Sequence, residues 1–166
     1  MVMSIRKWWI VAGSFTGLGL LIIVGIIFAP KPAVPIEIKR AVTSTILIPR
    51  RDGVTVSRDS MNYDAKLKRL TYTAMVFGVS VFVSEQSTPE SFVDIPQAYD
   101  KLVNAMNEYQ KFDTDVGTVH LTHPKELAGK QAGVMNAKGT LMFLKPDSDL
   151  SDDQWRKLFS SLEVIK

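Results

Sequence analysis

A run of 19 residues without a charged side chain, from Ile10 to Phe28, constrains this chain more than any other feature. As a helix rising about 1.5 Å per residue it would span roughly 28 Å, close to the hydrocarbon thickness of a bilayer. Two cations and two tryptophans precede it at residues 6–9, and prolines follow within residues 30–35. Basic and aromatic flanks and a proline stop are typical of membrane spans, so the run predicts one transmembrane helix.

A cleaved secretory signal is the alternative, because such signals also place an apolar core after a basic start. The run is longer than the usual signal core, and Ala29 has Ile27, not a small residue, two positions before it. These features favour an uncleaved anchor. The short basic N-terminal stub favours a cytoplasmic N-terminus, although three cations soon after the run weaken this charge bias. The remaining domain is then extracytoplasmic.

Gly13 and Gly17 form a Gly-x-x-x-Gly pair within the run. Such a pair lets two helix backbones approach closely, so the anchor has a candidate dimerisation face. Glycine is also common in membrane helices that do not pair, and this second interpretation stays open. The expected partners are therefore the lipid bilayer and either another envelope protein or a second copy of the chain.

Composition narrows the function of the rest of the chain. The absence of cysteine excludes thiolate metal sites, iron–sulfur ligation and thiol nucleophiles. Without Arg6 and Lys7 the chain has 18 cations against 17 anions. This balance lacks the excess of basic side chains that binding to nucleic-acid phosphates requires. We expect three parts: a cytoplasmic stub and anchor over 1–29, a proline-rich spacer over 30–35, and one domain over 36–166.

The domain is expected to be α+β, an antiparallel sheet packed by helices on one face and preceded by the transmembrane helix. Period-two alternation and turn residues predict the strands, and apolar spacing predicts helices over 97–109 and from Ser151 onward, with a short one over 36–42. The strand ranges are 46–48, 54–57, 67–77, 79–86, 116–122, 131–137 and 139–144.

Two groups of residues in the domain are candidate binding sites. Segment 84–92 (SEQSTPESF) follows a long strand, and Glu85, Gln86, Pro89 and Phe92 are its candidate binding surface, with a plain loop as the alternative. Adaptable thioethers could line an apolar pocket, whereas core filling is the commoner role for methionine. The residues of that pocket would be Met106, Met135 and Trp155.

Residues for catalysis or metal binding are sparse. His120, His123 and Glu126 have ligand-like spacing, but residues three apart on a strand face opposite sides, so we expect no metal and no cofactor. No Gly-x-Ser-x-Gly elbow, Walker loop or dinucleotide motif occurs in the sequence. A metal-dependent hydrolase using the two histidines is therefore a minor alternative to a non-enzymatic domain.

The anchor, the hairpin ‘LTYT…G-VSVFVSEQ-TPESF’, ‘VGTVHL’, ‘GTLMF’ and the closing ‘LS..QW.KLF.SLE’ resemble single-pass extracytoplasmic domains of unknown function in small-genome candidate-phylum bacteria. More weakly, they resemble the sheet-plus-helix domains of membrane-anchored regulators and lipoprotein-like carriers. The resemblance implies topology and no catalytic residue. The expected function is a membrane-anchored, non-enzymatic binding or assembly domain of unknown partner. The alternative is a carrier or sensor of a lipid or other apolar ligand.

Overall fold

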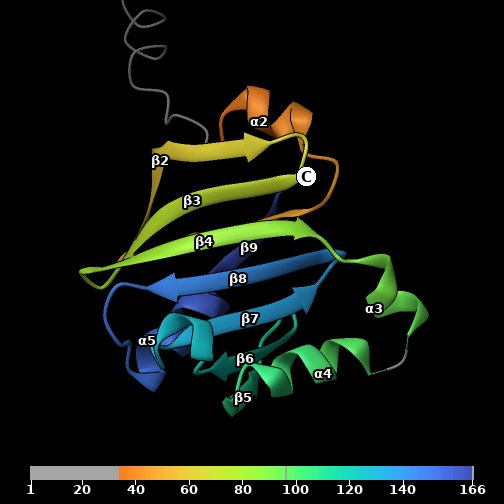
Figure 1. Cartoon of the computed structure of the whole chain (residues 1–166). Coiled ribbons are helices and arrows are strands. Elements are labelled where there is room, and N and C mark those ends of the chain that lie inside the picture. Colours follow the sequence, from red (N-terminus) through yellow and green to blue (C-terminus); the bar gives the residue numbers. More distant parts are fainter. Residues whose placement is uncertain (1–33, 96, 166) are drawn as a thin grey trace, which may run out of the picture. The chain divides into compact units, whose positions relative to one another are not determined.

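The computed structural model describes residues 34–95 and 97–165, which form an α+β fold with one large antiparallel sheet and few helices (Figure 1). The expected transmembrane helix, Gly13, Gly17 and spacer residues 30–33 lie outside the described residues. In the part that is described, no helix combines the length and apolar character that a membrane crossing needs.

Seven strands form the main sheet, in the order β2-β3-β4-β8-β7-β6-β5, and all neighbouring pairs are antiparallel. The strands are β2 (Val54–Asp64), β3 (Arg69–Val76), β4 (Val79–Ser87), β5 (Glu108–Asp113), β6 (Thr118–Thr122), β7 (Ala132–Ala137) and β8 (Thr140–Pro146). One meander builds the sheet inward from the β2 edge and another from the β5 edge. The two meet at the β4–β8 pair.

Both tight turns that the sequence predicts are present. Phe77 and Gly78 join β3 to β4 with φ of 48° and 88°, and Lys138 and Gly139 join β7 to β8 with φ of 54° and 76°. Two successive residues with positive φ match the twist of an antiparallel hairpin, and glycine adopts the second position at no steric cost.

Alternation along β4 separates an apolar core face from a mixed face, as the sequence predicts. Val81 and Val83 are at most 1% exposed, whereas Phe82 between them is 47% exposed. Successive strand residues point to opposite faces, so the valines join the core that includes Trp155 and Phe159.

Helices cover both faces of the sheet, which corrects the prediction of one covered face. A Cβ added to Gly133 in β7 would lie 2.9 Å from the Trp155 ring of α5 (Asp152–Ser160). On the other face, Tyr99 of α4 (Ala98–Ala105) contacts His120 of β6, with ring centroids 5.4 Å apart.

The register of the sheet shows that these contacts lie on opposite faces. Leu121 pairs with Gly133, and His120 is the residue before Leu121 in β6. Both faces are covered because β7 has apolar side chains on each of them. Val134 and Met135 are adjacent, so they point to opposite faces, and both are 0% exposed.

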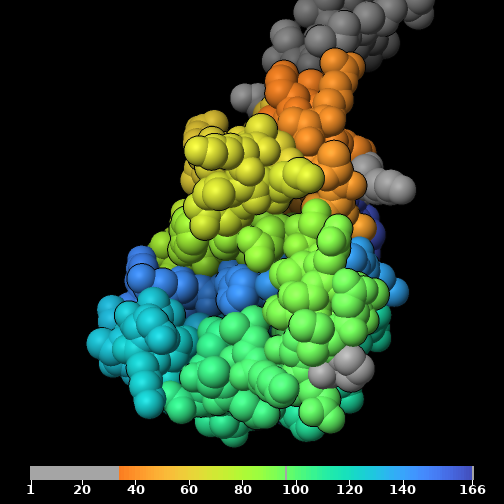
Figure 2. All heavy atoms as spheres, turned by 45° about the vertical axis from the view of Figure 1, so that its right-hand side comes forward, coloured from red at the N-terminus to blue at the C-terminus, as the bar shows by residue number. Residues whose placement is uncertain are grey.

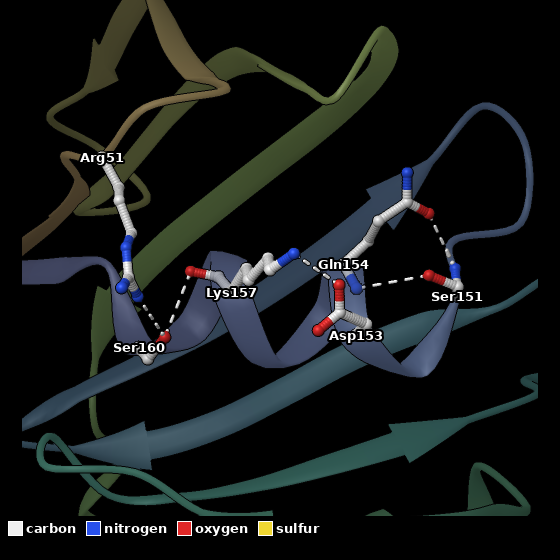
Figure 3. A network of polar contacts seen from close by, with 6 residues as sticks. All are labelled: Arg51, Ser151, Asp153, Gln154, Lys157 and Ser160. Carbon is white, nitrogen blue, oxygen red and sulfur yellow. Dashed lines mark hydrogen bonds and ion pairs between the residues drawn. The ribbon is translucent and has the colours of Figure 1, made fainter.

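Helix α5 begins at the capping box that the sequence predicts (Figure 3). The Ser151 hydroxyl accepts a hydrogen bond from the Gln154 backbone N–H at 3.3 Å, and the Gln154 side-chain carbonyl accepts one from the Ser151 N–H at 2.9 Å. The box satisfies two backbone donors that a helix start otherwise leaves unpaired. At the other end, Arg51 donates to the Ser160 hydroxyl at 3.3 Å.

A second, two-stranded sheet pairs β1 (Ile46–Pro49) with β9 (Leu162–Ile165), which directly follows α5. The expected strand at 46–48 is confirmed, and β9 was not anticipated. The short helix expected over 36–42 is α2 (Ile36–Ala41). The core extends past this helix to Val34, which is 4% exposed although it lies in the predicted spacer.

Three stretches differ from their predicted structure. The strand expected over 54–57 is β2, which continues to Asp64. The helix expected over 97–109 ends at Ala105, Asn107 adopts φ of 55°, and Tyr109 lies in β5. The expected loop over 84–92 is the end of β4 followed by α3 (Glu90–Asp94). A one-turn 3-10 helix, η1 (Lys125–Leu127), precedes β7.

Candidate binding site

A polar hollow of about 560 Å³ lies between the first turn of α4 and the sheet. Two other cavities, one beside α2 and one beside α5, have volumes of about 390 and 220 Å³. Small-ligand pockets usually have volumes of about 300–1,000 Å³. The hollow, termed the α4 pocket, is lined by Tyr99, Asp100, Lys111, Phe112, Asp113, Thr118, His120 and Asn136.

Strand register brings the polar lining of the α4 pocket together. In the β5–β6 pair, Lys111 lies opposite His120 and Asp113 lies opposite Thr118. Residues two apart on a strand share a face, so all four side chains point to the face that α4 covers. Asn136 of β7 adds an amide to the same face.

Charges of both signs surround the pocket. Asp113 accepts a hydrogen bond from the Thr118 hydroxyl at 2.7 Å. Nδ1 of His120 lies 3.3 Å from Oε1 of Glu108, and the His120 side chain is 12% exposed. With the amine of Lys111, the pocket presents cationic, anionic and neutral polar groups, an arrangement suited to a polar or zwitterionic group.

Two of the lining residues, Tyr99 and His120, belong to an aromatic series that continues to Phe92 outside the pocket. The ring centroids of Phe92 and Tyr99 are 5.6 Å apart, and those of Tyr99 and His120 are 5.4 Å apart with the rings nearly perpendicular. Burial raises the pKa of Tyr99 well above its usual value, so its hydroxyl stays protonated. Neither that hydroxyl nor Nδ1 of His120 makes a hydrogen bond of good geometry with the described residues, although both atoms are buried.

The predicted binding segment 84–92 borders this pocket. The Thr88 hydroxyl donates to the side-chain oxygen of Asn136 at 2.5 Å, and Phe92 belongs to the aromatic series. Gln86 and Pro89 are half-buried beside them. The structure thus brings Phe92 to the pocket and holds the segment against it through Thr88.

Helix α3 and the residue that follows it carry exposed aliphatic side chains. Val93 is 77% exposed and Ile95 is 52% exposed. The backbone N–H of Ala98, at the start of α4, donates to the Ile95 carbonyl. This hydrogen bond holds the end of α3 next to the start of α4, which lines the pocket. In Figure 2 the two helices lie next to each other on one face of the molecule. Phe92, Val93, Ile95 and the α4 pocket together are termed the α3–α4 surface.

Glu85 belongs to the core and not to an accessible surface, because it is 2% exposed. Its Oε2 accepts a hydrogen bond from the Leu47 backbone N–H at 3.0 Å, and its Oε1 lies 2.9 Å from the Tyr72 hydroxyl. That hydroxyl also lies 2.8 Å from the Leu47 carbonyl oxygen. These contacts join β4 and β3 of the main sheet to β1 of the small sheet.

The geometry of this group favours a neutral Glu85 carboxyl. The Tyr72 hydroxyl has one proton, and the Leu47 carbonyl can only accept, so the hydroxyl donates to Leu47. A neutral Glu85 would donate its own proton across the 2.9 Å contact to Tyr72, whereas an ionised Glu85 would have to share the one Tyr72 proton with the Leu47 carbonyl. Burial raises the pKa of Glu85 to about 8, which agrees with that assignment.

The residues proposed for an apolar pocket lie apart from the α4 pocket. Met135 and Trp155 are 0% exposed and pack in the core, and Met106 is half-buried at the end of α4.

The two histidines that the sequence gives as candidate metal ligands have other neighbours. His120 lies beside Glu108, and His123 stacks on Tyr109 with ring centroids 4.4 Å apart. Across residues 34–95 and 97–165 no group of three metal-ligating side chains gathers.

Lys111 and Asp113 are pocket residues that the sequence analysis did not identify, because β5 was assigned partly to a helix. Asn107 carries a signal for the end of that helix, since asparagine tolerates the left-handed backbone that ends a helix, but it does not give the β5–β6 register. The chain matches no family model, no curated protein and no solved structure.

Proposed function

We propose that this chain is a membrane-anchored, non-enzymatic extracytoplasmic domain that binds another envelope protein through the α3–α4 surface. The observation that carries the proposal is the position of two exposed aliphatic side chains, Val93 and Ile95, beside a polar pocket of about 560 Å³. Exposed apolar groups next to convergent polar groups are typical of protein recognition sites. The uncharged run over residues 10–28 supports the membrane anchor.

The two parts of the surface suit one polypeptide partner. An apolar side chain of the partner would pack on Val93 and Ile95, and a charged or amide side chain would enter the pocket between Lys111 and Asp113. A carrier of an apolar ligand would instead need space at Met135 and Trp155, which are both 0% exposed. The α3–α4 surface is therefore the better-supported site.

Photo-crosslinking in cells tests this function. With a photoreactive amino acid at Val93 of the full chain, we expect a discrete adduct with one envelope protein, identified by mass spectrometry. The control places the same group at Val164, which is 52% exposed on β9. Exchanging the pocket charges with Lys111→Asp and Asp113→Lys should reduce the Val93 adduct several-fold. The exchange reverses the arrangement of positive and negative charge to which the partner is complementary.

Two results would contradict the proposal: equal adducts from Val93 and Val164, or a Val93 adduct that the charge exchange does not change. A Val93 probe that gives no adduct while the protein is present in the membrane fraction would contradict it as well.

A further inference from the structure

A cluster of cations and aliphatic side chains occupies the end of the domain that follows the predicted anchor. Helix α2 contributes Ile36, Lys39 and Arg40, and the β2–β3 turn contributes Lys66, Leu67 and Lys68. All six are exposed, and Ile36 and Leu67 are each 53% exposed. Within the described residues, none of the four cations lies within 4.0 Å of a carboxylate oxygen.

The two segments form one surface, termed the basic patch. A groove of about 390 Å³ separates α2 from the end of β2, and its lining runs to Ala65, the residue before Lys66. Figure 2 shows α2 in orange next to the yellow end of β2 and its turn. The acidic groups at this end are Glu37 and Asp64, and Asp64 already accepts backbone hydrogen bonds from Lys66 and Leu67.

We infer that the basic patch rests on the anionic headgroups of the membrane that holds the anchor. The inference rests on the proposed membrane anchoring. Cations attract an anionic membrane over a Debye length of about 8 Å, and aliphatic side chains insert among the headgroups.

The connecting chain is too short to let the patch lie far from the bilayer. Val34 is 4% exposed and fixed in the core, and only five residues separate it from Phe28, the end of the predicted span. Even fully extended, this connection is about 20 Å long. Because α2 begins two residues after Val34, the basic patch lies next to the point where this tether joins the domain.

Lipid contact also fixes the direction of the α3–α4 surface. The basic patch lies at the β2 edge of the main sheet, whereas the α4 pocket lies over β5, β6 and β7 at the other edge. If the β2 edge contacts the membrane, the α3–α4 surface faces away from the membrane and is accessible to a partner protein.

Site-specific fluorescence quenching tests the inference on the full chain in lipid vesicles. The chain has no cysteine, so Ala65→Cys carries a single environment-sensitive fluorophore beside the patch. Glu126→Cys, on η1 near the other edge, carries the control fluorophore. The vesicles consist of phosphatidylcholine alone or of equimolar phosphatidylcholine and phosphatidylglycerol, each with a small fraction of headgroup-spin-labelled lipid as quencher.

In the anionic vesicles we expect quenching at Ala65 to be at least about twofold greater than at Glu126, and to fall in 1 M salt, where the Debye length is about 3 Å. Lys66→Glu with Lys68→Glu should reduce it to the control level. The matched pair Lys125→Glu with Lys130→Glu, exposed near η1, should leave it unchanged.

Equal quenching at Ala65 and Glu126 in anionic vesicles overturns the inference, as does Ala65 quenching that is the same in neutral vesicles. If the patch instead meets an acidic protein, Ala65 quenching stays low in vesicles and the inference fails. Flotation of the same vesicles separates the two proposals: protein that does not float contradicts the anchor itself, whereas floating protein without quenching contradicts only the basic patch.

Discussion

Replacing Glu85 by glutamine is expected to remove a large pH dependence from the stability of the domain. In the native protein the pKa of Glu85 is raised to about 8 by burial, from a usual value of 4.5. Between these pH values the folded state keeps a proton that the unfolded state has lost, so stability falls as pH rises. At about 1.4 kcal/mol per pH unit, this single group accounts for roughly 5 kcal/mol.

Glutamine reproduces the neutral carboxyl, because its amide N–H donates to Tyr72 and its carbonyl accepts from the Leu47 N–H. Urea denaturation of the full chain in mild detergent, followed by circular dichroism from pH 4.5 to 8, measures the free energy of unfolding. The variant should gain stability over the native protein steadily across this range. In the control Tyr72→Phe, the Leu47 carbonyl lies buried without the 2.8 Å hydrogen bond, so we expect a loss at every pH. A constant difference between Glu85→Gln and the native protein would show that Glu85 is ionised in the fold.

Truncating Trp155 to alanine is expected to lower the free energy of unfolding by about 3–5 kcal/mol. The side chain is 0% exposed, stacks on Phe159 with ring centroids 5.9 Å apart, and covers Gly133 of β7. Its indole N–H donates to the Gln131 side chain at 3.0 Å, so the truncation also removes a hydrogen bond. The same denaturation experiment at one pH measures the loss.

The matched control truncates an exposed aromatic residue on the opposite face of the sheet. Phe82 is 47% exposed, and Phe82→Ala should cost about 1 kcal/mol or less. If Trp155→Ala lowered the free energy of unfolding by no more than Phe82→Ala, this result would contradict the packing of α5 on β7.

Local patterns predict the elements whose signal is local. The β3–β4 hairpin has alternating side chains and a glycine turn, and α5 has a complete capping box at Ser151, so both were predictable. Strand β9 has no such signal, because it begins directly after α5 and is held by pairing with β1, more than a hundred residues earlier. The coverage of both faces of the sheet also has no local signal, because it depends on which strands become neighbours.

The candidate site was predictable only in part. Polar residues after a strand predict a binding surface at 84–92, and Phe92 packs on Tyr99, which lines the α4 pocket. Glu85 shares the buried face with Val81 and Val83 by strict alternation, so the pattern that predicts β4 also predicts its burial. Lys111 and Asp113 join the pocket only through the β5–β6 register, which sequence spacing does not reveal.

The position of Val93 relative to the membrane tests the central claim most directly. Val93→Cys would be the only cysteine in the chain and lies on the most exposed part of α3. In intact cells or spheroplasts, a membrane-impermeant maleimide should label it while the protein stays in the carbonate-washed membrane fraction. A cysteine at Ser4 should react only after permeabilisation. Labelling of Val93→Cys only after permeabilisation, or recovery of the protein outside the membrane fraction, would contradict an anchored domain that meets its partner outside the cytosol.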